Sequence, residues 1–215
     1  QFGAINTKQA TAISLACDDL IAGKLHEQFV VDVIQGGAGT PTNMNANEVI
    51  ANRALEHLGL PKGTYGVIHP NDHVNASQST NDSYPTAVKL ATYAGIQKLL
   101  IALAELRSAF EAKAGEFAHI LKIGRTQLQD AVPMTLGQEF SAFAAMIADD
   151  EKRLRESAYL MTEVNMGGTA IGTGITAHPD YAERVRARLA EIQARIASLT
   201  TRESEVMAGM VAGRL

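Results

Sequence analysis

The segment PTAVKLATYAGIQKLLIALAELRSAFEAKAGEF (85–117) decides the fold of this chain. Its apolar or small residues recur at steps of three and four, at Val88, Thr92, Ile96, Leu99, Leu103, Leu106 and Phe110. That spacing places them on one face of an α-helix. Pro85 suits the first turn of such a helix, where its missing N–H has no partner to lose. The sequence therefore predicts a helix from Pro85 to about Phe117.

A second long helix is predicted from Thr135 to about Val164. Its apolar stripe consists of Leu136, Phe140, Phe143, Ile147, Leu154, Ala158 and Met161. The acidic interruption Asp149-Asp150-Glu151 is expected to form a solvated face, and Gly167 and Gly168 are expected to end the helix. Both helices are much longer than the average of about 11–12 residues, which favours a helical bundle.

The predicted fold class is all-α. Shorter helical patterns lie at 7–23, 45–59 and 179–197. We expect a small N-terminal lobe over residues 1–82, a partial long-helix bundle domain over 83–192 and a divergent helical tail over 193–215.

Composition excludes several functional classes. With 46% hydrophobic and 20% charged residues, the chain has ordinary globular values. A net charge of −4 gives no electrostatic footprint for nucleic acid or an anionic membrane. The nearest approach to a spanning segment, LLIALAEL (99–106), is short and contains Glu105. Because Cys17 is the single cysteine and the start QFGAINTKQA lacks a signal-peptide pattern, a cytoplasmic protein is expected.

Four polar or glycine-rich loops separate the helices. They are GGAGTPTNMN (36–45), HPNDHVNASQSTND (69–82), GRTQLQDAVPMT (124–135) and NMGGTAIGTG (165–174). The scattered histidines lack the spacing of a metal site, and GGTAIGTG lacks the lysine of a phosphate loop, so we expect no metal and no cofactor. Hydroxyls and amides in quantity suit a small anion, since each hydrogen bond to a charged group contributes roughly 1.5–3 kcal/mol. The loops are predicted to form a cup for a dicarboxylate, with ordinary turn and cap roles as the alternative.

These loops and their flanks resemble the aspartase/fumarase superfamily in order and spacing. The matching segments are GGAGTPTNMNANEVIANRA, HPNDHVNASQSTNDSYPTA, GRTQLQDAVPMTLGQEF and GGTAIGTGITAHPDY, and the similarity runs from about residue 1 to about residue 190. Within the superfamily they are most similar to the aspartase branch, the aspartate ammonia-lyases. The resemblance implies reversible deamination of L-aspartate to fumarate and ammonia by β-elimination through an aci-carboxylate dianion. It also implies a homotetramer whose sites form where three subunits meet.

The resemblance further implies roles for individual residues. Thr40 of GGAGT and Ser79 and Thr80 of QSTN would donate to the β-carboxylate, where negative charge develops, and Asn81 would hold the amino group. His73 falls where relatives have a polar residue near a secondary anion site. A loop-stabilising role for His73 is the open alternative.

Thr126 and Gln127 of GRTQ are the residues expected in the catalytic centre. By resemblance they would come from another subunit and hold the α-carboxylate or the amino group. Similar fumarases usually have histidine where this chain has Gln127. A hydroxyl leaving group needs acid–base help, for which histidine is suited, whereas an ammonium carries its own protons. The glutamine therefore favours an ammonia-lyase over a fumarate hydratase, which stays the alternative.

Two features depart from the superfamily pattern. The loop pattern SSIMPxKxNP, which by resemblance supplies a serine base together with Lys and Asn, does not occur in the 215 residues. Complete members are more than twice as long, so this truncated chain alone is expected to lack the catalytic base. A catalytically incomplete structural or binding remnant is therefore a further hypothesis.

The second departure is the tail. LTTRESEVMAGMVAG (199–213) is similar to the opening of a LuxR/FixJ-type helix-turn-helix. Thr200 or Thr201 would cap a new helix, with Glu203 in its first turn and Gly213 past its end. The alternative is an ordinary amphipathic helix on the bundle. Since no recognition helix follows, a DNA-binding regulator is disfavoured, and neither nucleic acid nor membrane is an expected partner.

Overall fold

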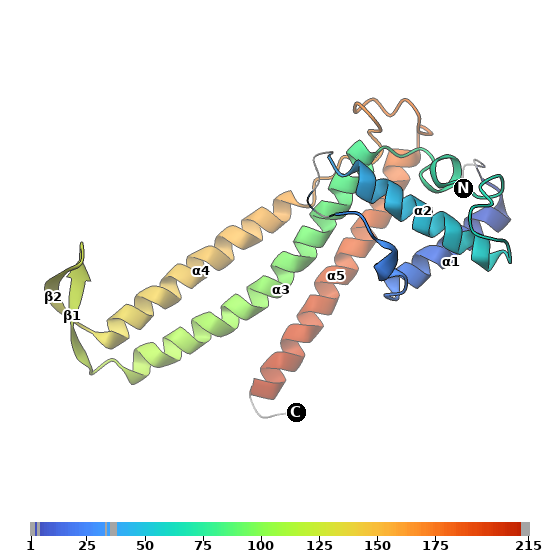
Figure 1. Ribbon diagram of the computed structural model, residues 1–215. Helices are drawn as coiled ribbons and strands as arrows, with labels where there is room; N and C mark the ends of the chain where they lie inside the picture. Colours follow the sequence, from blue (N-terminus) through green and yellow to red (C-terminus); the bar gives the residue numbers. More distant parts are fainter. Residues whose placement is uncertain (1–2, 4, 33, 35–37, 212–215) are drawn as a thin grey trace. The chain divides into compact units, whose positions relative to one another are not determined.

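The computed structural model describes residues 3, 5–32, 34 and 38–211, with side chains described as far as residue 197. Its helices are α1 (Thr7–Ile21), α2 (Thr40–His57), α3 (Thr80–Glu116), α4 (Leu136–Leu160) and α5 (Tyr181–Val211) (Figure 1). Two short turns, η1 (His26–Gln28) and η2 (Pro70–Val74), lie between them, and an antiparallel hairpin of β1 (Leu121–Thr126) and β2 (Gln129–Thr135) joins α3 to α4. The predicted, mainly helical fold is confirmed.

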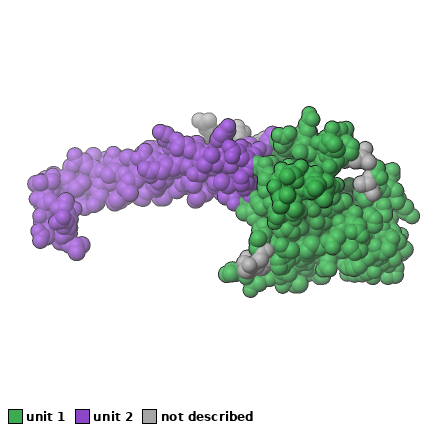
Figure 2. Space-filling view, turned by 90° about the horizontal axis from the view of Figure 1, so that it is seen from above, with its two compact units in different colours: residues 1–88, 164–190 green, residues 89–163, 191–215 purple. Residues whose placement is uncertain are grey.

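The chain divides into two compact units. Unit 1 comprises residues 1–88 and 164–190, and unit 2 comprises 89–163 and 191–215 (Figure 2). Each unit is thus built from two separate stretches of sequence. The predicted boundaries near 82 and 192 lie close to two of these limits, but the return of 164–190 to the N-terminal unit was not foreseen. That the predicted lobe, bundle and tail are domains stays a prediction.

In unit 1, α1 and α2 pack through small side chains. The buried core consists of Ala12, Ala16, Ala51, Ala54, Leu55 and Ile68. Because alanine side chains are short, the two helices can approach closely. Asn6 starts α1 with a capping box, in which Asn6 Oδ1 accepts from the Gln9 N–H at 2.9 Å and Gln9 Oε1 accepts from the Asn6 N–H at 3.0 Å.

An ion-pair cluster also joins α1 to α2. Asp19 near the end of α1 lies 2.6 Å from Lys24 Nζ, 2.6 Å from Arg53 Nε and 2.9 Å from His57 Nε2. The hydrogen bonds from Lys24 and Arg53 hold the pKa of the Asp19 carboxyl well below its usual range. The cluster therefore links the C-terminal halves of the two helices while Asp19 is ionised.

In unit 2, α3 and α4 lie side by side (Figure 1). Near the hairpin their contact contains an aromatic cluster of Phe110, Phe117, Phe140 and Phe143, with ring centroids 5.4–5.9 Å apart. A Cβ at Gly137 would overlap the Ala114 carbonyl and lie 2.7 Å from Ala118 Cα. The first turn of α4 can therefore lie against the end of α3 only because residue 137 is glycine.

The prediction of a solvated Asp149–Glu151 face is wrong for Glu151, which is 3% exposed. Arg107 Nε of α3 and Arg155 Nη2 of α4 donate to its two carboxylate oxygens, each at 2.9 Å. The hydrogen bond from Arg107 lowers the pKa of Glu151, although burial of the carboxyl acts in the opposite direction. Glu151 thus supplies a charged contact between the two long helices. The helical pattern alone does not show whether such a polar residue is solvated or paired across a helix contact.

The position predicted for Pro85 is also wrong. Because α3 begins at Thr80, Pro85 lies inside the helix. A proline there leaves the carbonyl four residues earlier without its helical donor, and that carbonyl belongs to Asn81. The side chain of Asn165 takes the donor's place, with Nδ2 at 2.6 Å from Asn81 O.

Two predicted helix boundaries differ from those observed. α4 ends at Leu160 with Met161 as its C-cap, so Gly167 and Gly168 lie in the following loop. α5 runs without a break to Val211, so no new helix begins at Thr200 or Thr201, and Gly213 lies outside the described residues. The backbone of the tail therefore lacks the helix start that the helix-turn-helix resemblance implied.

By length and composition alone, α3 meets the criteria for a helix that could cross a membrane. One 18-residue window has a mean hydropathy of 1.3, and 6% of that window is buried. The sequence prediction had required an uninterrupted apolar run, which α3 lacks. An exposed apolar surface of this kind is typical of an interaction site.

Candidate anion-binding site

Two helix N-termini meet in unit 1. Asn43, in the first turn of α2, donates from Nδ2 to Thr80 Oγ1 at 2.9 Å, at the first residue of α3. Its Oδ1 accepts from Ser83 Oγ at 3.2 Å. Each helix start carries a positive partial charge and backbone N–H groups without helical partners. Two such ends held together suit a small anion.

The start of α2 depends on a glycine. Gly39 precedes Thr40 with φ of +85°, and a Cβ at this position would overlap the ring of Tyr84. Tyr84 belongs to the second turn of α3, so the same contact packs the two helix starts together. Thr40, the predicted ligand of GGAGT, lies exposed at the first position of α2.

Ser79 and Thr80 present hydroxyl groups at the start of α3. Ser79 Oγ accepts from the Asn81 N–H at 3.1 Å, and Thr80 Oγ1 accepts from Asn43. A hydroxyl that accepts from the chain can still donate its own proton. Both groups therefore fit the donor role predicted for them, and the structure brings them together with Thr40 and Asn81 in unit 1.

Asp82 is buried beneath these residues, with 0% exposed. Its Oδ1 accepts from the Ser79 N–H at 2.9 Å, while Oδ2 accepts from the Thr169 N–H at 2.8 Å and the Gly167 N–H at 3.3 Å. Burial, and secondarily the Asp82 charge, raises the pKa of Tyr181. Asp82 thus connects the first turn of α3 to the loop that follows α4.

Sequence reasoning missed both Asp82 and Asn43, although each lies inside a quoted motif. The available signal for Asp82 was its place three residues after Ser79, the spacing of a helix-capping pair. For Asn43 the signal was an amide in the first turn of a helix next to GGAGT. Neither spacing reveals contacts with segments distant along the chain.

Asn81 is held by the same loop. Its Nδ2 donates to Ala170 O at 2.8 Å, and its backbone carbonyl accepts from Asn165 as described above. Its amide oxygen is then the atom suited to accept from a bound amino group. The role predicted for Asn81 is compatible with this arrangement and stays a prediction.

His73 has a structural contact in its own loop. Its Nδ1 accepts from the His69 N–H at 2.7 Å inside the π-helical turn η2. His69 Nδ1 in turn accepts from the N–H groups of Asn71 and Asp72 at 3.2 and 3.3 Å. The loop-stabilising alternative therefore has direct support, while anion binding by His73 stays a prediction.

Thr126 and Gln127 belong to unit 2 and are not part of this cluster. They lie at the tip of the hairpin, where the sequence predicted a loop and the structure has paired strands, with Thr126 opposite Gln129. The two residues between them, Gln127 and Leu128, have φ of 48° and 67°. Such a turn normally contains Asn-Gly, because side chains disfavour positive φ. Strain of this kind at an exposed tip is typical of binding loops.

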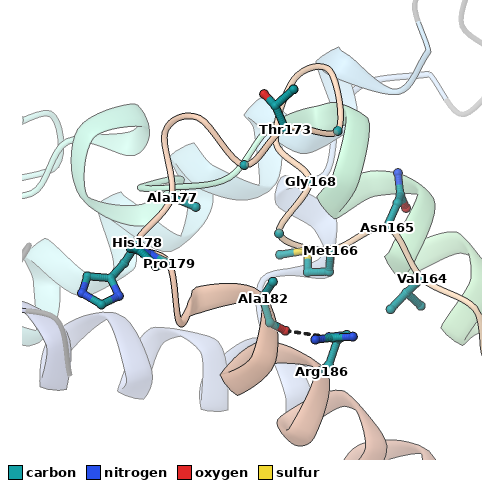
Figure 3. A pocket seen from close by; sticks show the side chains of 13 residues that line it. Val164, Asn165, Met166, Gly168, Thr173, Ala177, His178, Pro179, Ala182 and Arg186 are labelled. Carbon is teal, nitrogen blue, oxygen red and sulfur yellow. Dashed lines mark hydrogen bonds between the residues drawn. The ribbon is translucent and has the colours of Figure 1, made fainter.

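The loop after α4 borders a separate cavity of about 450 Å³ (Figure 3). The glycine-rich segment 164–179 and the first turns of α5 line it, and Arg186 lies beside Ala182, to whose carbonyl its Nε donates at 3.1 Å. Thr40, Ser79, Thr80 and Asn81 do not line this cavity. Throughout the described part of the chain, no group of three or more His, Cys, Asp or Glu side chains could hold a metal ion.

The sequence and the fold have counterparts in a known family. The sequence model of the family described as Lyase (Lyase_1) matches residues 1–209. The chain belongs to this lyase family, the aspartase/fumarase superfamily that its motifs predicted. The match includes most of the tail that was expected to depart from the family.

Individual relatives show how much of the family's length is present. The aspartate ammonia-lyase of Helicobacter pylori is 56% identical over 195 residues, which are 91% of this chain and 42% of that protein. That of Pseudomonas aeruginosa is 61% identical over 193 residues, 89% of this chain and 41% of that protein. The chain thus spans about two fifths of the length of these relatives.

Solved structures agree with the fold. The structure of fumarate lyase:delta crystallin from Brucella melitensis bound to cobalt matches with a TM-score of 0.81 and 60% identity, covering 88% of this chain and 41% of that one. A recombinant class II fumarase from Schistosoma mansoni matches with a TM-score of 0.73 and 34% identity, covering 95% and 42%.

Proposed function

We propose that the protein is an aspartate ammonia-lyase, which converts L-aspartate reversibly to fumarate and ammonia in the cytoplasm. The observation that carries the proposal is the pair of helix N-termini joined by Asn43. Thr40, Ser79 and Thr80 lie at these helix starts, and their hydroxyl groups are neutral donors of the kind that suits a carboxylate. The named relatives at 56% and 61% identity support the choice of aspartate.

The cup would act mainly by stabilising the negative charge that develops on the β-carboxylate during the reaction. A base removes a proton from the carbon beside the β-carboxylate, and the bonding electrons move into that carboxylate to give a dianion. Those electrons then form the carbon–carbon double bond as the carbon–nitrogen bond breaks and ammonia leaves. Donors that are already oriented toward the dianion lower the barrier, because they need no reorganisation as the charge forms.

The other residues divide the remaining tasks. Asn81 would accept from the amino group, and Thr126 and Gln127 of another subunit would hold the α-carboxylate or the amino group. None of these side chains is proposed as the base. Because Gln127 does no acid–base work near neutral pH, the tip of the hairpin is better suited to an ammonium leaving group than to a hydroxyl.

The proposed partner is further copies of the same chain, in the homotetramer implied by the family. Several large apolar side chains of α3 and α4 are substantially exposed: Leu99 47%, Leu106 41%, Phe143 39% and Met146 63%. Such a surface marks an interaction site. Association through it would also cover the apolar window of α3 without a membrane.

The test is formation of fumarate by the full-length purified protein, followed by ultraviolet absorbance with L-aspartate or L-malate as substrate. Fumarate from L-aspartate is expected. Fumarate from L-malate alone would show a hydratase, and none from either would show a catalytically incomplete remnant.

The residue roles have their own prediction. Ser79→Ala and Thr126→Ala, made separately, should each lower kcat/KM by an amount equivalent to about 2–4 kcal/mol of activation free energy. Each removes one donor to developing or bound charge. Ser108→Ala, an exposed hydroxyl on α3 in unit 2, is the matched control and should keep wild-type turnover. Wild-type kinetics in the Ser79 or Thr126 variant would remove that residue from the site.

A further inference from the structure

The segment 165–170 holds the first turn of α3 from outside the helix. Asp82 Oδ2 accepts from the N–H groups of Gly167 and Thr169 at 3.3 and 2.8 Å. Asn165 Nδ2 donates to Asn81 O at 2.6 Å, and Asn81 Nδ2 donates to Ala170 O at 2.8 Å. Four hydrogen bonds therefore converge on two adjacent residues of the proposed cup.

The backbone of this segment is shaped for the contact. Gly167 and Thr169 have φ of 94° and 58°, which turns both of their N–H groups toward the same carboxylate oxygen. A threonine at positive φ is uncommon and is kept only where its surroundings enforce it. Thr169 is 4% exposed, so the loop is packed and not a loose connection.

Pro85 explains why the helix accepts an outside partner at this point. Without an N–H at residue 85, the Asn81 carbonyl has no helical donor, and Asn165 supplies one. The proline thus leaves a carbonyl acceptor on α3 to which the loop can donate. The loop therefore holds the Asn81 backbone in two ways. Asn165 bonds the Asn81 carbonyl directly, and the carboxylate of the next residue, Asp82, is bonded to the N–H groups of Gly167 and Thr169.

The orientation of the Asn81 side chain follows from the same contacts. Its amide nitrogen is directed to Ala170 O, which leaves Oδ1 as the atom to meet a ligand. An amide oxygen accepts hydrogen bonds and an ammonium only donates them. This orientation therefore fits an amino group. It does not suit a carboxylate, which when ionised has no proton to donate to the amide oxygen.

We propose that segment 165–170 is the positioning element for the amino-group side of the site, with Asn165 and Asp82 as positioning residues that orient Asn81. The inference rests on the proposed function. Ser79 and Thr80 have no direct hydrogen bond to segment 165–170: Thr80 is bonded to Asn43, and Ser79 is bonded within the first turn of α3, to Asn81 and to Asp82 Oδ1. Loosening the segment should therefore weaken recognition of the amino group and leave the grip on carboxylates intact.

The experiment compares Asn165→Ala with Asn6→Ala in the full-length protein. Both residues are exposed asparagines of unit 1 whose side chains bond the backbone, and Asn6 caps α1. The readouts are kcat and KM for L-aspartate and the inhibition constant of succinate, which has both carboxylates but no amino group. In Asn165→Ala, KM for L-aspartate should rise about tenfold, equivalent to about 1.4 kcal/mol, while the succinate constant stays within about twofold. Asn6→Ala should change neither.

A merely structural role gives a different pattern. Partial unfolding lowers kcat but leaves KM and the succinate constant unchanged, and a disturbed cup weakens both ligands equally. Either pattern overturns the inference. Asn81→Ala supplies a second check, because adding Asn165→Ala to it should have no further effect on KM if Asn165 acts through Asn81. An additive loss also overturns the inference.

The proposed function is tested separately by the wild type. A wild-type protein that forms no fumarate from L-aspartate overturns the proposed function and this inference with it. An active wild type with an unchanged Asn165→Ala variant overturns the inference alone.

Discussion

Gly39 illustrates how one missing methyl group organises the candidate site. The ring of Tyr84 occupies the space that a Cβ would fill, so the starts of α2 and α3 lie in contact. Gly59 offers a matched comparison, because it too has positive φ, of 73°, but apart from its neighbours in the chain no residue lies within 4 Å of a Cβ built there.

The comparison gives a stability prediction. Gly59→Ala should cost about 1–2 kcal/mol from the left-handed backbone alone. Gly39→Ala should cost roughly 1–3 kcal/mol more, because the Tyr84 ring must also move. Urea denaturation followed by circular dichroism measures both. Equal losses in the two variants would show that the Tyr84 contact is unimportant.

The hairpin tip gives a prediction of opposite sign. Leu128 is 92% exposed and has φ of 67°, so it bears conformational strain with little burial in return. Leu128→Gly should raise the free energy of unfolding by roughly 0.5–1 kcal/mol, the relief of left-handed strain less the added flexibility of glycine in the unfolded chain. Ala131→Gly, at an exposed strand position, should lower it. Destabilisation by Leu128→Gly would show that the leucine makes a contact worth more than the strain.

At single residues, the sequence identified polar side chains of the candidate site but not the contacts that hold them. The donor character of Ser79 and Thr80, and the amide of Asn81, followed from residue type and motif. The positions of Asn43 and Asp82 beneath them depend on α2 and on loop 165–170, which are distant along the chain. A polar residue in a motif does not show whether it faces a ligand or a buried backbone N–H.

Among the elements, α3 and α4 depend on a charge that lies between them. Arg107 holds the pKa of Glu151 below its ordinary value. A carboxyl whose folded pKa is depressed stabilises the fold above its unfolded pKa of about 4.3 and loses that contribution as the pH falls through the folded value. Glu151→Gln should therefore lower Tm at pH 7, and the difference from wild type should shrink below about pH 4.

Thermal unfolding by circular dichroism across that pH range tests the prediction. Glu156→Gln, an exposed position on the same helix, is the control and should have little effect on Tm at pH 7. A Glu151→Gln deficit that is constant with pH would show that shape and not charge makes the contact.

The existence of the helices was predictable, but several of their ends were not. Steps of three and four identified α3 and α4 because their apolar stripes are long. Pro85 misled the assignment of the α3 start, since a proline is tolerated inside a helix when another donor replaces its N–H. The polar composition of GRTQLQDAVPMT predicts a loop, and the hairpin is hard to recognise because Gln127-Leu128 lacks the glycine that normally indicates a tight turn.

For the whole molecule, the exposed apolar residues predict self-association. Replacing both Leu99 and Leu106 by Glu should raise the apparent dissociation constant at least about tenfold, because charges would enter the covered surface. Analytical ultracentrifugation measures the change. Ile21→Glu, at an 84% exposed position of unit 1, is the control. An unchanged assembly in the double variant would exclude this face from the interface.

The division into units was the least predictable property of the molecule. Reading along the chain suggests successive segments, but Gly167 and Thr169 satisfy a carboxylate that lies more than eighty positions earlier. No local pattern reports such a pairing.

The discontinuity of unit 1 has a consequence for synthesis. The segment 1–88 cannot complete its unit until residues 164–190 have left the ribosome. At about 5–20 residues per second, that interval lasts on the order of 5–20 seconds. During it the Asp82 carboxylate stays hydrated and the Asn81 carbonyl lacks its amide donor. A chaperone or a nascent-chain protease would therefore meet the proposed substrate cup in an open form before any catalytic form exists.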